Sequence, residues 1–212
     1  MTQGKKVRTQ SERSQESSRR MLDAATQLIA DQGFTRTTIP QIAKKAGYSH
    51  GLVNQRFGSK SEMIQILANE FQGYFTFEQL APAIEGRSGV DALVATIEAY
   101  IDAISQSGSL GRAYYELLGE SVVLVPEIHE IFVGADVRLR ALVEQTIRSA
   151  IESDEIPSDV DPPAIAALVV AILRGVSMQW VLNSDGLDLT AVKGEIRRLF
   201  ELAFNRPLED KP

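Results

Sequence analysis

Apolar residues recur at spacings of three and four along most of the chain, and no segment alternates strictly between apolar and polar residues. Spacings of three and four place apolar side chains on one face of an α-helix, whereas a half-buried strand requires alternation. The pattern therefore predicts an all-α protein of about nine helices. The first is expected over residues 14–32, where Met21, Ala25 and Ile29 belong to one apolar stripe and Gly33 follows as a left-handed C-terminal cap.

Three further helices are expected next, because each is preceded by a side chain that can accept the free N–H groups of a helix N-terminus. The signals are, in chain order, Thr38 with Gln41 before a helix that ends at Gly47, Ser49 before a helix over 50–57, and Ser59 with Glu62 before a fourth helix. Val53 and Phe57 are one turn apart, so both point from the third helix toward the same core.

Five more apolar helices are expected beyond residue 76. They cover about 88–107, 110–123, 126 up to a loop at 154–161, 162 to about 183, and a final segment striped by Val192, Ile196, Leu199, Phe200 and Ala203. Proline at the first helical position, as at Pro126 and Pro162, favours a helix start because the missing N–H would have no partner there.

The composition adds limits on the class of protein. The chain has 212 residues, of which 44% are hydrophobic and 24% charged, as in ordinary globular proteins. It contains no cysteine, which excludes disulfides, zinc–thiolate sites and cysteine nucleophiles. The first residues lack the apolar segment of a secretory signal, and the longest uncharged apolar stretch, 162–173, is shorter than the roughly 20 residues that a membrane span needs. We therefore expect a cytoplasmic protein without a membrane partner.

The charge is divided between two parts of the chain. The net charge of −6 argues against nucleic acid, but residues 1–60 hold 11 Lys and Arg against 4 Asp and Glu, and residues 61–212 hold 11 against 24. Such asymmetry points to a nucleic-acid surface on the basic part, although a solvated basic face is the alternative. We expect a basic flexible arm over 1–13, a DNA-binding domain over 14–60 and a second domain over 61–212.

The two short helices on either side of 47–49 fit a helix-turn-helix, whose second helix enters the DNA major groove. That helix needs an apolar inner face and polar groups on its outer face that can bond base edges. The expected contacts to bases and their immediate surroundings come from Ser49, His50, Gly51, Leu52, Asn54, Gln55 and Arg56. The expected contacts to phosphates come from Thr38, Lys44, Tyr48 and Lys60, of which Lys60 is best placed because it starts a helix.

The stretch 22–64, LDAATQLIADQGFTRTTIPQIAKKAGYSHGLVNQRFGSKSEMI, resembles the DNA-binding domain of the tetracycline-repressor-type (TetR) family of bacterial regulators. The resemblance rests on GF-TRTTI, IAKKAG, SHG and RFGSK in this order. It implies an all-α homodimer with a three-helix head, a connecting fourth helix and a regulatory domain whose last two helices pair with their mates. Family members commonly have tyrosine where this chain has Asn54, so here Asn54 is expected to read a base instead of a phosphate.

The helix expected over 162–183 supports a dimer independently. Ala167, Ala171 and Gly175 are four residues apart, and such a stripe lets a second helix approach closely. The final helix is expected to add Val192, Ile196, Leu199 and Phe200 to the interface. A central helix of a monomeric bundle is the alternative reading of the same pattern.

Aromatic residues gather after the head, and an apolar cavity between helices is the expected site of a small-molecule effector. On helices that the family resemblance places around that cavity, the expected lining residues are Tyr100, Tyr115, Phe132 and Trp180, with Arg112 and His129 as polar contacts. His129 lies beside Glu127 and Glu130, but this spacing is poor for a metal. Neither a metal nor a cofactor is expected.

These features favour a ligand-responsive repressor that binds double-stranded, roughly palindromic operator DNA as a homodimer and is released by a small molecule. The alternative is an architectural or corepressor-like DNA-binding protein of the same fold that is controlled by a protein partner. An enzyme is not expected, because the sequence has no phosphate loop, no nucleophile elbow and no metal-spaced histidine pair.

Overall fold

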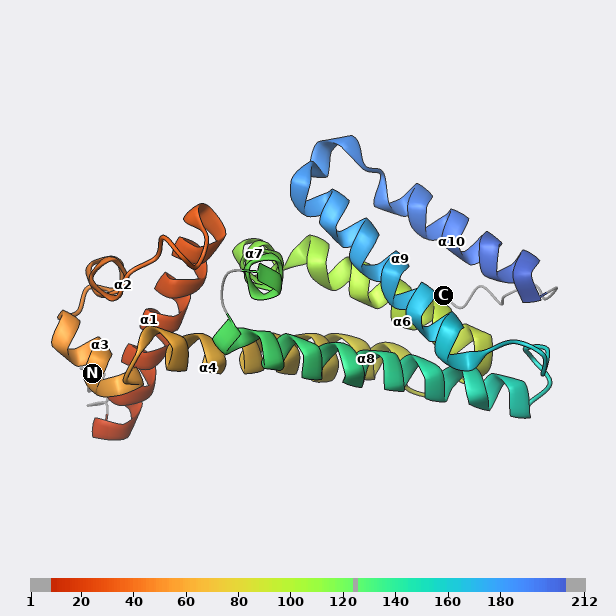
Figure 1. The fold of residues 1–212 in the computed structure, drawn as a ribbon, viewed down its shortest axis with the longest axis horizontal. Helices are drawn as coiled ribbons and strands as arrows, with labels where there is room; N and C mark the ends of the chain where they lie inside the picture. Colours follow the sequence, from red (N-terminus) through yellow and green to blue (C-terminus); the bar gives the residue numbers. More distant parts are fainter. Residues whose placement is uncertain (1–8, 124–125, 205–212) are drawn as a thin grey trace, which may run out of the picture.

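The computed structural model describes residues 9–123 and 126–204, and every regular element within these ranges is helical (Figure 1). The all-α prediction is confirmed. Residues 9–57 form a small head at one end of the molecule, and residues 81–204 form a larger helical body (Figure 1). Residues 60–80 join the two, and the first part of this connection runs along the body beside one of its long helices.

The head contains three helices: α1 (Gln10–Gln32), α2 (Ile39–Ala46) and α3 (His50–Phe57). The capping signals predicted for α2 and α3 are confirmed, with capping side chains at Thr38 and Ser49. Gly47 ends α2 at φ 79° and ψ 31°, which is the left-handed conformation that favours glycine. The three helices therefore meet at the predicted turns.

The first helix ends at Gln32 as predicted, but its start and the conformation of Gly33 differ from the prediction. It begins at Gln10 and not at Ser14, because Thr9 and Glu12 form a capping box that was not anticipated. Residues 10–13, which the sequence places in a flexible arm, are thus helical, and the basic residues Lys5, Lys6 and Arg8 lie outside the described residues. Gly33 has the expected positive φ of 81°, but its ψ of 162° is extended and not left-handed helical.

The connection and the body contain the remaining helices. In chain order these are α4 (Lys60–Gly73), a π-helical segment (Tyr74–Leu80), α5 (Ala81–Ile84), α6 (Gly89–Gln106), α7 (Ser109–Val123), α8 (Pro126–Glu152), α9 (Pro162–Leu182), a short 3₁₀ turn (Ser184–Gly186) and α10 (Leu189–Phe204). The sequence predicted all of the α-helices except α5, and it did not predict the π-helical segment. Glu62 and Ser59 form the capping box expected at the start of α4.

The body is built around α6, α8 and α9, which pack against one another. The last helix, α10, is fixed to α6 by two ion pairs, Lys193 to Asp102 at 2.7 Å and Arg197 to Glu98 at 3.1 Å. By length and composition alone α9 can cross a membrane, but Arg174 in its second half forms an ion pair of 2.7 Å with Asp136 of α8. One face of α9 therefore packs on α6 and α8 in the body, while its other face is exposed.

Candidate DNA interface and ligand cavity

The outer face of α3 carries the polar side chains that the sequence assigns to DNA bases. Val53 and Phe57 are 0% and 7% exposed, so the opposite face is fixed in the head core. Asn54 Nδ2 lies 3.1 Å from His50 Nε2. The exposed residues of the outer face are His50, Gly51, Asn54 and Gln55. This helix therefore presents hydrogen-bonding groups outward from a rigid support, which a helix that reads the major groove requires.

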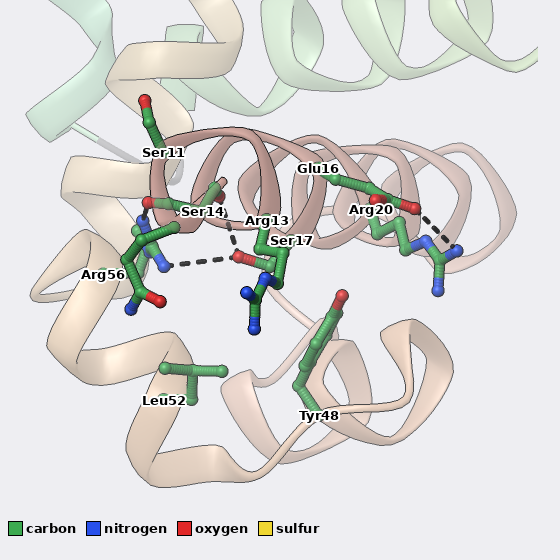
Figure 2. Close-up of a pocket in the computed structure, with 10 residues that line it drawn as sticks. Ser11, Arg13, Ser14, Glu16, Ser17, Arg20, Tyr48, Leu52 and Arg56 are labelled. Atoms are coloured by element: carbon green, nitrogen blue, oxygen red, sulfur yellow. Dashed lines mark hydrogen bonds and ion pairs between the residues drawn. The ribbon is translucent and has the colours of Figure 1, made fainter. Parts of the chain in front are cut away.

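Arg56, on the last turn of the same helix, is directed toward α1 (Figure 2). Its guanidinium donates hydrogen bonds to the hydroxyls of Ser14 and Ser17, the second at 3.3 Å. The predicted contact between Arg56 and a guanine or a phosphate stays a prediction, and the structure adds a contact within the head. In the structure this side chain joins α3 to α1.

A groove of about 840 Å³ lies between the first turns of α1 and the α2–α3 turn (Figure 2). Arg20 pairs with Glu16 at 3.0 Å along its α1 wall, and the Tyr48 side chain points across from the opposite wall (Figure 2). The lining residues are Gln10, Ser11, Arg13, Ser14, Glu16, Ser17, Arg20, Tyr48, Leu52 and Arg56. Arginine and hydroxyl groups beside α3, the helix expected to enter the major groove, are of the kinds that bind phosphates of the DNA backbone.

Among the other residues predicted to contact DNA, two cap helices and one is exposed. Thr38 Oγ1 accepts the Gln41 N–H at 3.4 Å, and Ser49 Oγ accepts the Leu52 N–H at 3.2 Å, so both hydroxyls cap their own helices. Lys44 is exposed on α2. Their predicted DNA contacts stay predictions, and for Thr38 and Ser49 the structure adds a capping role.

Lys60, expected to be the leading phosphate contact, points into the head. Its ammonium donates to the carbonyl oxygens of Phe34 and Thr37, both at 2.7 Å, and lies 3.9 Å from the centre of the Phe34 ring. Partial burial lowers the pKa of Lys60 from its ordinary value, while the nearby Glu120 carboxylate raises it. Two of its three N–H donors are thus used inside the protein, which corrects the picture of a side chain free for phosphate.

The body contains a cavity of about 340 Å³ among α4, the π-helical segment, α6, α7 and α8. Its aromatic wall is compact: Phe75 stacks on Tyr100 at 5.6 Å between ring centres and meets Tyr114 edge-on at 5.5 Å. The lining residues are Asn69, Gly73, Phe75, Leu80, Tyr100, Tyr114, Ala135, Arg138, Leu139 and Leu142. A mostly apolar cavity of this size with a few polar groups is typical of a small-molecule site.

The residues predicted to bind an effector do not come together. Among them only Tyr100 lines this cavity. Arg112 and Trp180 line a separate groove of about 550 Å³ between the ends of α1, α6 and α9 and the start of α7. His129 Nδ1 lies 3.1 Å from the Ser121 carbonyl oxygen and connects α8 to α7. The other two, Tyr115 and Phe132, are buried at 3% and 4% exposure and line neither space.

Behind the aromatic wall lies a cluster of buried polar groups. Burial raises the pKa of Tyr100 well above its ordinary value, and neighbouring Tyr114 and Tyr115 raise it further. Burial also raises the pKa of Tyr115, against the effect of the adjacent Ser177 hydroxyl. The hydroxyls of Tyr100, Tyr115 and Ser177 lie close enough to interact with one another, although none makes a hydrogen bond of good geometry within the described residues. Because Tyr100 lines the cavity, this group of buried hydroxyls lies directly beside it.

The predicted dimer residues are divided between the surface and the interior. Ala167, Ala171 and Gly175 are all exposed on α9. On α10, Leu199 is 59% exposed, whereas Ile196 and Phe200 are 5% and 8% exposed. The assignment of Ile196 and Phe200 to the dimer interface is corrected, because the face of α10 that carries them packs into the core of the single chain. Val192 is half-buried.

Several residues of the two sites were missed by the sequence analysis. Ser14 and Ser17 line the groove and bind Arg56, and only their position on the first helix pointed to them. In the cavity, Phe75 and Leu80 come from the π-helical segment, for which the sequence contains no signal. Tyr114 belongs to the aromatic group noted in the sequence, but no local pattern separates a cavity residue from a core residue.

Comparisons with known proteins agree with this arrangement. The family described as "Bacterial regulatory proteins, tetR family" matches residues 21–66, and the family described as "BetI-type transcriptional repressor, C-terminal" matches residues 89–203, more than half of the chain. The transcriptional regulator TtgR of Pseudomonas putida is 24% identical over 188 residues, which cover 86% of this chain and 89% of TtgR.

Solved structures share the fold. The fatty acid degradation regulator FadR from Bacillus halodurans has a TM-score of 0.73 at 22% identity, and covers 87% of this chain and 94% of its own. SmeT, solved in complex with triclosan, has a TM-score of 0.73 at 20% identity, and covers 93% of this chain and 99% of its own. On these matches and the fold, the chain belongs to the TetR family of bacterial transcriptional regulators.

Proposed function

We propose that this TetR-family chain is a repressor that binds a roughly palindromic operator as a homodimer and leaves it when a small molecule enters the body cavity. The observation that carries the DNA-binding part is α3, whose inner face is fixed by Val53 and Phe57 while its outer face is polar and exposed. Two such helices in a dimer fit successive major grooves, so half-sites about one helical turn apart follow.

The homodimer is supported by apolar side chains that stay on the surface of the single chain. Leu168 and Leu182 of α9 are 61% and 77% exposed, and Leu199 and Leu202 of α10 are 59% and 69% exposed. Isolated exposed leucines are ordinary, but four on two consecutive helices, together with the exposed stripe of Ala167, Ala171 and Gly175 on α9, favour an interaction surface. Pairing α9 and α10 with their mates removes these side chains from water.

Control by a small molecule is favoured over control by a protein partner because the body has a ligand-sized cavity of about 340 Å³. A ligand that binds one arrangement of the two heads better than another shifts the dimer between them. The SmeT complex, in which a protein of this fold holds triclosan, supports the same reading. A filled body with no cavity would have favoured the corepressor-like alternative.

The proposal is tested by selecting DNA from a random-sequence library with the wild-type chain and comparing three variants on the selected site. Asn54→Ala and Gln55→Ala are each expected to relax the preference at one base position by about 1–3 kcal/mol. Lys44→Ala is the control, since loss of a phosphate contact lowers affinity for all sequences and reduces the salt dependence. If no sequence is enriched, or if the site is not palindromic, the proposal is wrong.

A further inference from the structure

The helix α7 contacts both the cavity and the head. Tyr114, near its start, belongs to the cavity wall, and α7 packs along α1 of the head. Glu120 follows Tyr114 by six residues, which is about 9 Å along a helix at 1.5 Å per residue. A rigid element of this length connects a ligand in the body to the head.

Glu120 is bound to the turn between α1 and α2. Its Oε2 accepts hydrogen bonds from the Thr35 backbone N–H and from the Thr35 hydroxyl, both at 2.9 Å. The other carboxylate oxygen lies so close to Gly33 that a Cβ there would be 2.6 Å from it. Gly33 also has φ 81°, so only glycine combines this backbone with the approach of the carboxylate.

The same turn is also held by Lys60 at the start of α4 and by a hydrogen bond within the turn. Lys60 of α4 donates to the carbonyl oxygens of Phe34 and Thr37, and the Thr37 hydroxyl donates to the Gly33 carbonyl oxygen at 2.8 Å. The turn is therefore a closed, hydrogen-bonded unit, and α2 begins directly after it at Thr38. A displacement of the turn is passed on to α2 and from there to α3.

We infer that Glu120 is a positioning residue that couples the cavity to the DNA-binding head through the α1–α2 turn. When an occupied cavity displaces α7, the Thr35 contacts carry the displacement into the turn and so into the orientation of α3. The regulatory meaning of this coupling rests on the proposed function. The mechanical link itself involves only contacts within the chain.

Glu116 provides a matched control. It is one turn before Glu120 on the same side of α7, and its carboxylate also lies toward Gly33, 3.9 Å from the position of a Cβ there. Glu120, not Glu116, makes the two hydrogen bonds to the turn. Removing either carboxylate changes the charge of α7 equally, so a difference between Glu120→Ala and Glu116→Ala isolates the effect of the contacts.

The experiment fills the cavity by mutation and reads the head by hydrogen exchange, so it needs neither an identified effector nor an operator. Ala135→Leu places a larger side chain in the cavity, and Leu139→Phe is a second, independent filler. Each is expected to change amide exchange over residues 33–46 by about fivefold or more, the lower range of typical allosteric coupling. Ala141→Leu, at an exposed position of α8, is expected to leave it unchanged.

In the Glu120→Ala background the same fillers are expected to have no effect on the head, while in the Glu116→Ala background the effect remains. Glu120→Gln, which keeps an acceptor oxygen for Thr35, is expected to retain part of it. An effect of both fillers that persists without Glu120, or no effect of either filler in the wild type, overturns the inference. Neither result bears on whether the chain binds an operator, so the failure of this inference is distinct from a failure of the proposed function.

Discussion

Arg56 lies on the recognition-type helix, yet its guanidinium is used inside the head. Because it donates to Ser14 and Ser17, it fixes the angle between α3 and α1. Hydrogen bonds from a charged donor are stronger than those between neutral groups. The orientation of α3, on which any reading of a base sequence depends, is thus set partly by Arg56 through its contacts with α1.

Arg56→Ala is expected to lower the free energy of unfolding by about 1 kcal/mol, since the half-buried contacts are charge-assisted but partly exposed to water. Urea unfolding measures the change. A double Ser14→Ala/Ser17→Ala variant removes the same contacts from the other side, so adding Arg56→Ala to it is expected to cost little more. Asn54→Ala on the same helix is the control. Fully additive losses would show that Arg56 acts through other contacts.

At this scale the sequence predicts which residue types face outward but not where a long side chain ends. Arg56 and Lys60 were both assigned to DNA because of their charge and position. In the structure each donates to groups distant in sequence: Ser14 and Ser17 for Arg56, the turn carbonyls for Lys60. Such contacts depend on how helices pack, and no local pattern contains that information.

At the scale of helices, the backbone conformation requires glycine at one of two positions near the α2–α3 turn but not at the other. Gly47 has φ 79° and so adopts the left-handed conformation, whereas Gly51 lies inside α3 with ordinary helical geometry. A Cβ at either position meets no atom within 4 Å. Any effect of substitution on stability therefore comes from the backbone alone.

Gly47→Ala is expected to destabilise the chain by about 1–2 kcal/mol because a left-handed alanine is strained. Gly51→Ala is expected to stabilise it by about 0.5–1 kcal/mol, since alanine is the better helix former. Both are measured by urea unfolding, each serving as the control for the other. On the selected DNA, Gly51→Ala is expected to weaken binding despite its stability. Unchanged affinity would show that the backbone at Gly51 does not approach the DNA closely.

Most helix ends with local signals were predicted, although the box of Thr9 and Glu12 was missed, and the ends without such signals were not predicted. The boxes at Thr38 and Ser59 and the left-handed Gly47 are all formed by residues within a few positions of each other. The π-helical segment and α5 have no such signal, and no side-chain cap precedes α5. Their form follows from packing against α4 and α6, which only the folded body provides.

For the whole molecule, the cavity and the exposed apolar face are both products of assembly. The cavity takes its lining from α4, the π-helical segment, α6, α7 and α8, so five elements must be placed before it exists. That is why the sequence predicted that aromatic residues would surround a ligand but identified only Tyr100 among its lining. The small-residue stripe of α9 is exposed, and its spacing is a local pattern that the sequence contains, whereas on α10 the sequence did not separate the exposed Leu199 from the buried Ile196 and Phe200.

The exposed apolar side chains of α9 and α10 predict that the chain forms a dimer. Leu168→Glu and Leu199→Glu place a carboxylate where the proposed dimer is apolar, and a buried unpaired charge costs about 3–5 kcal/mol, which raises the dimer dissociation constant more than about a hundredfold. Sedimentation velocity is expected to give a dimer for the wild type and a monomer for the double variant. Val122→Glu is the matched control, because Val122 is 68% exposed but lies on α7.

Since each monomer retains one α3, the double variant is also expected to bind a half-site but not to favour the full palindrome. A double variant that remains dimeric would place the interface elsewhere, whatever the DNA result.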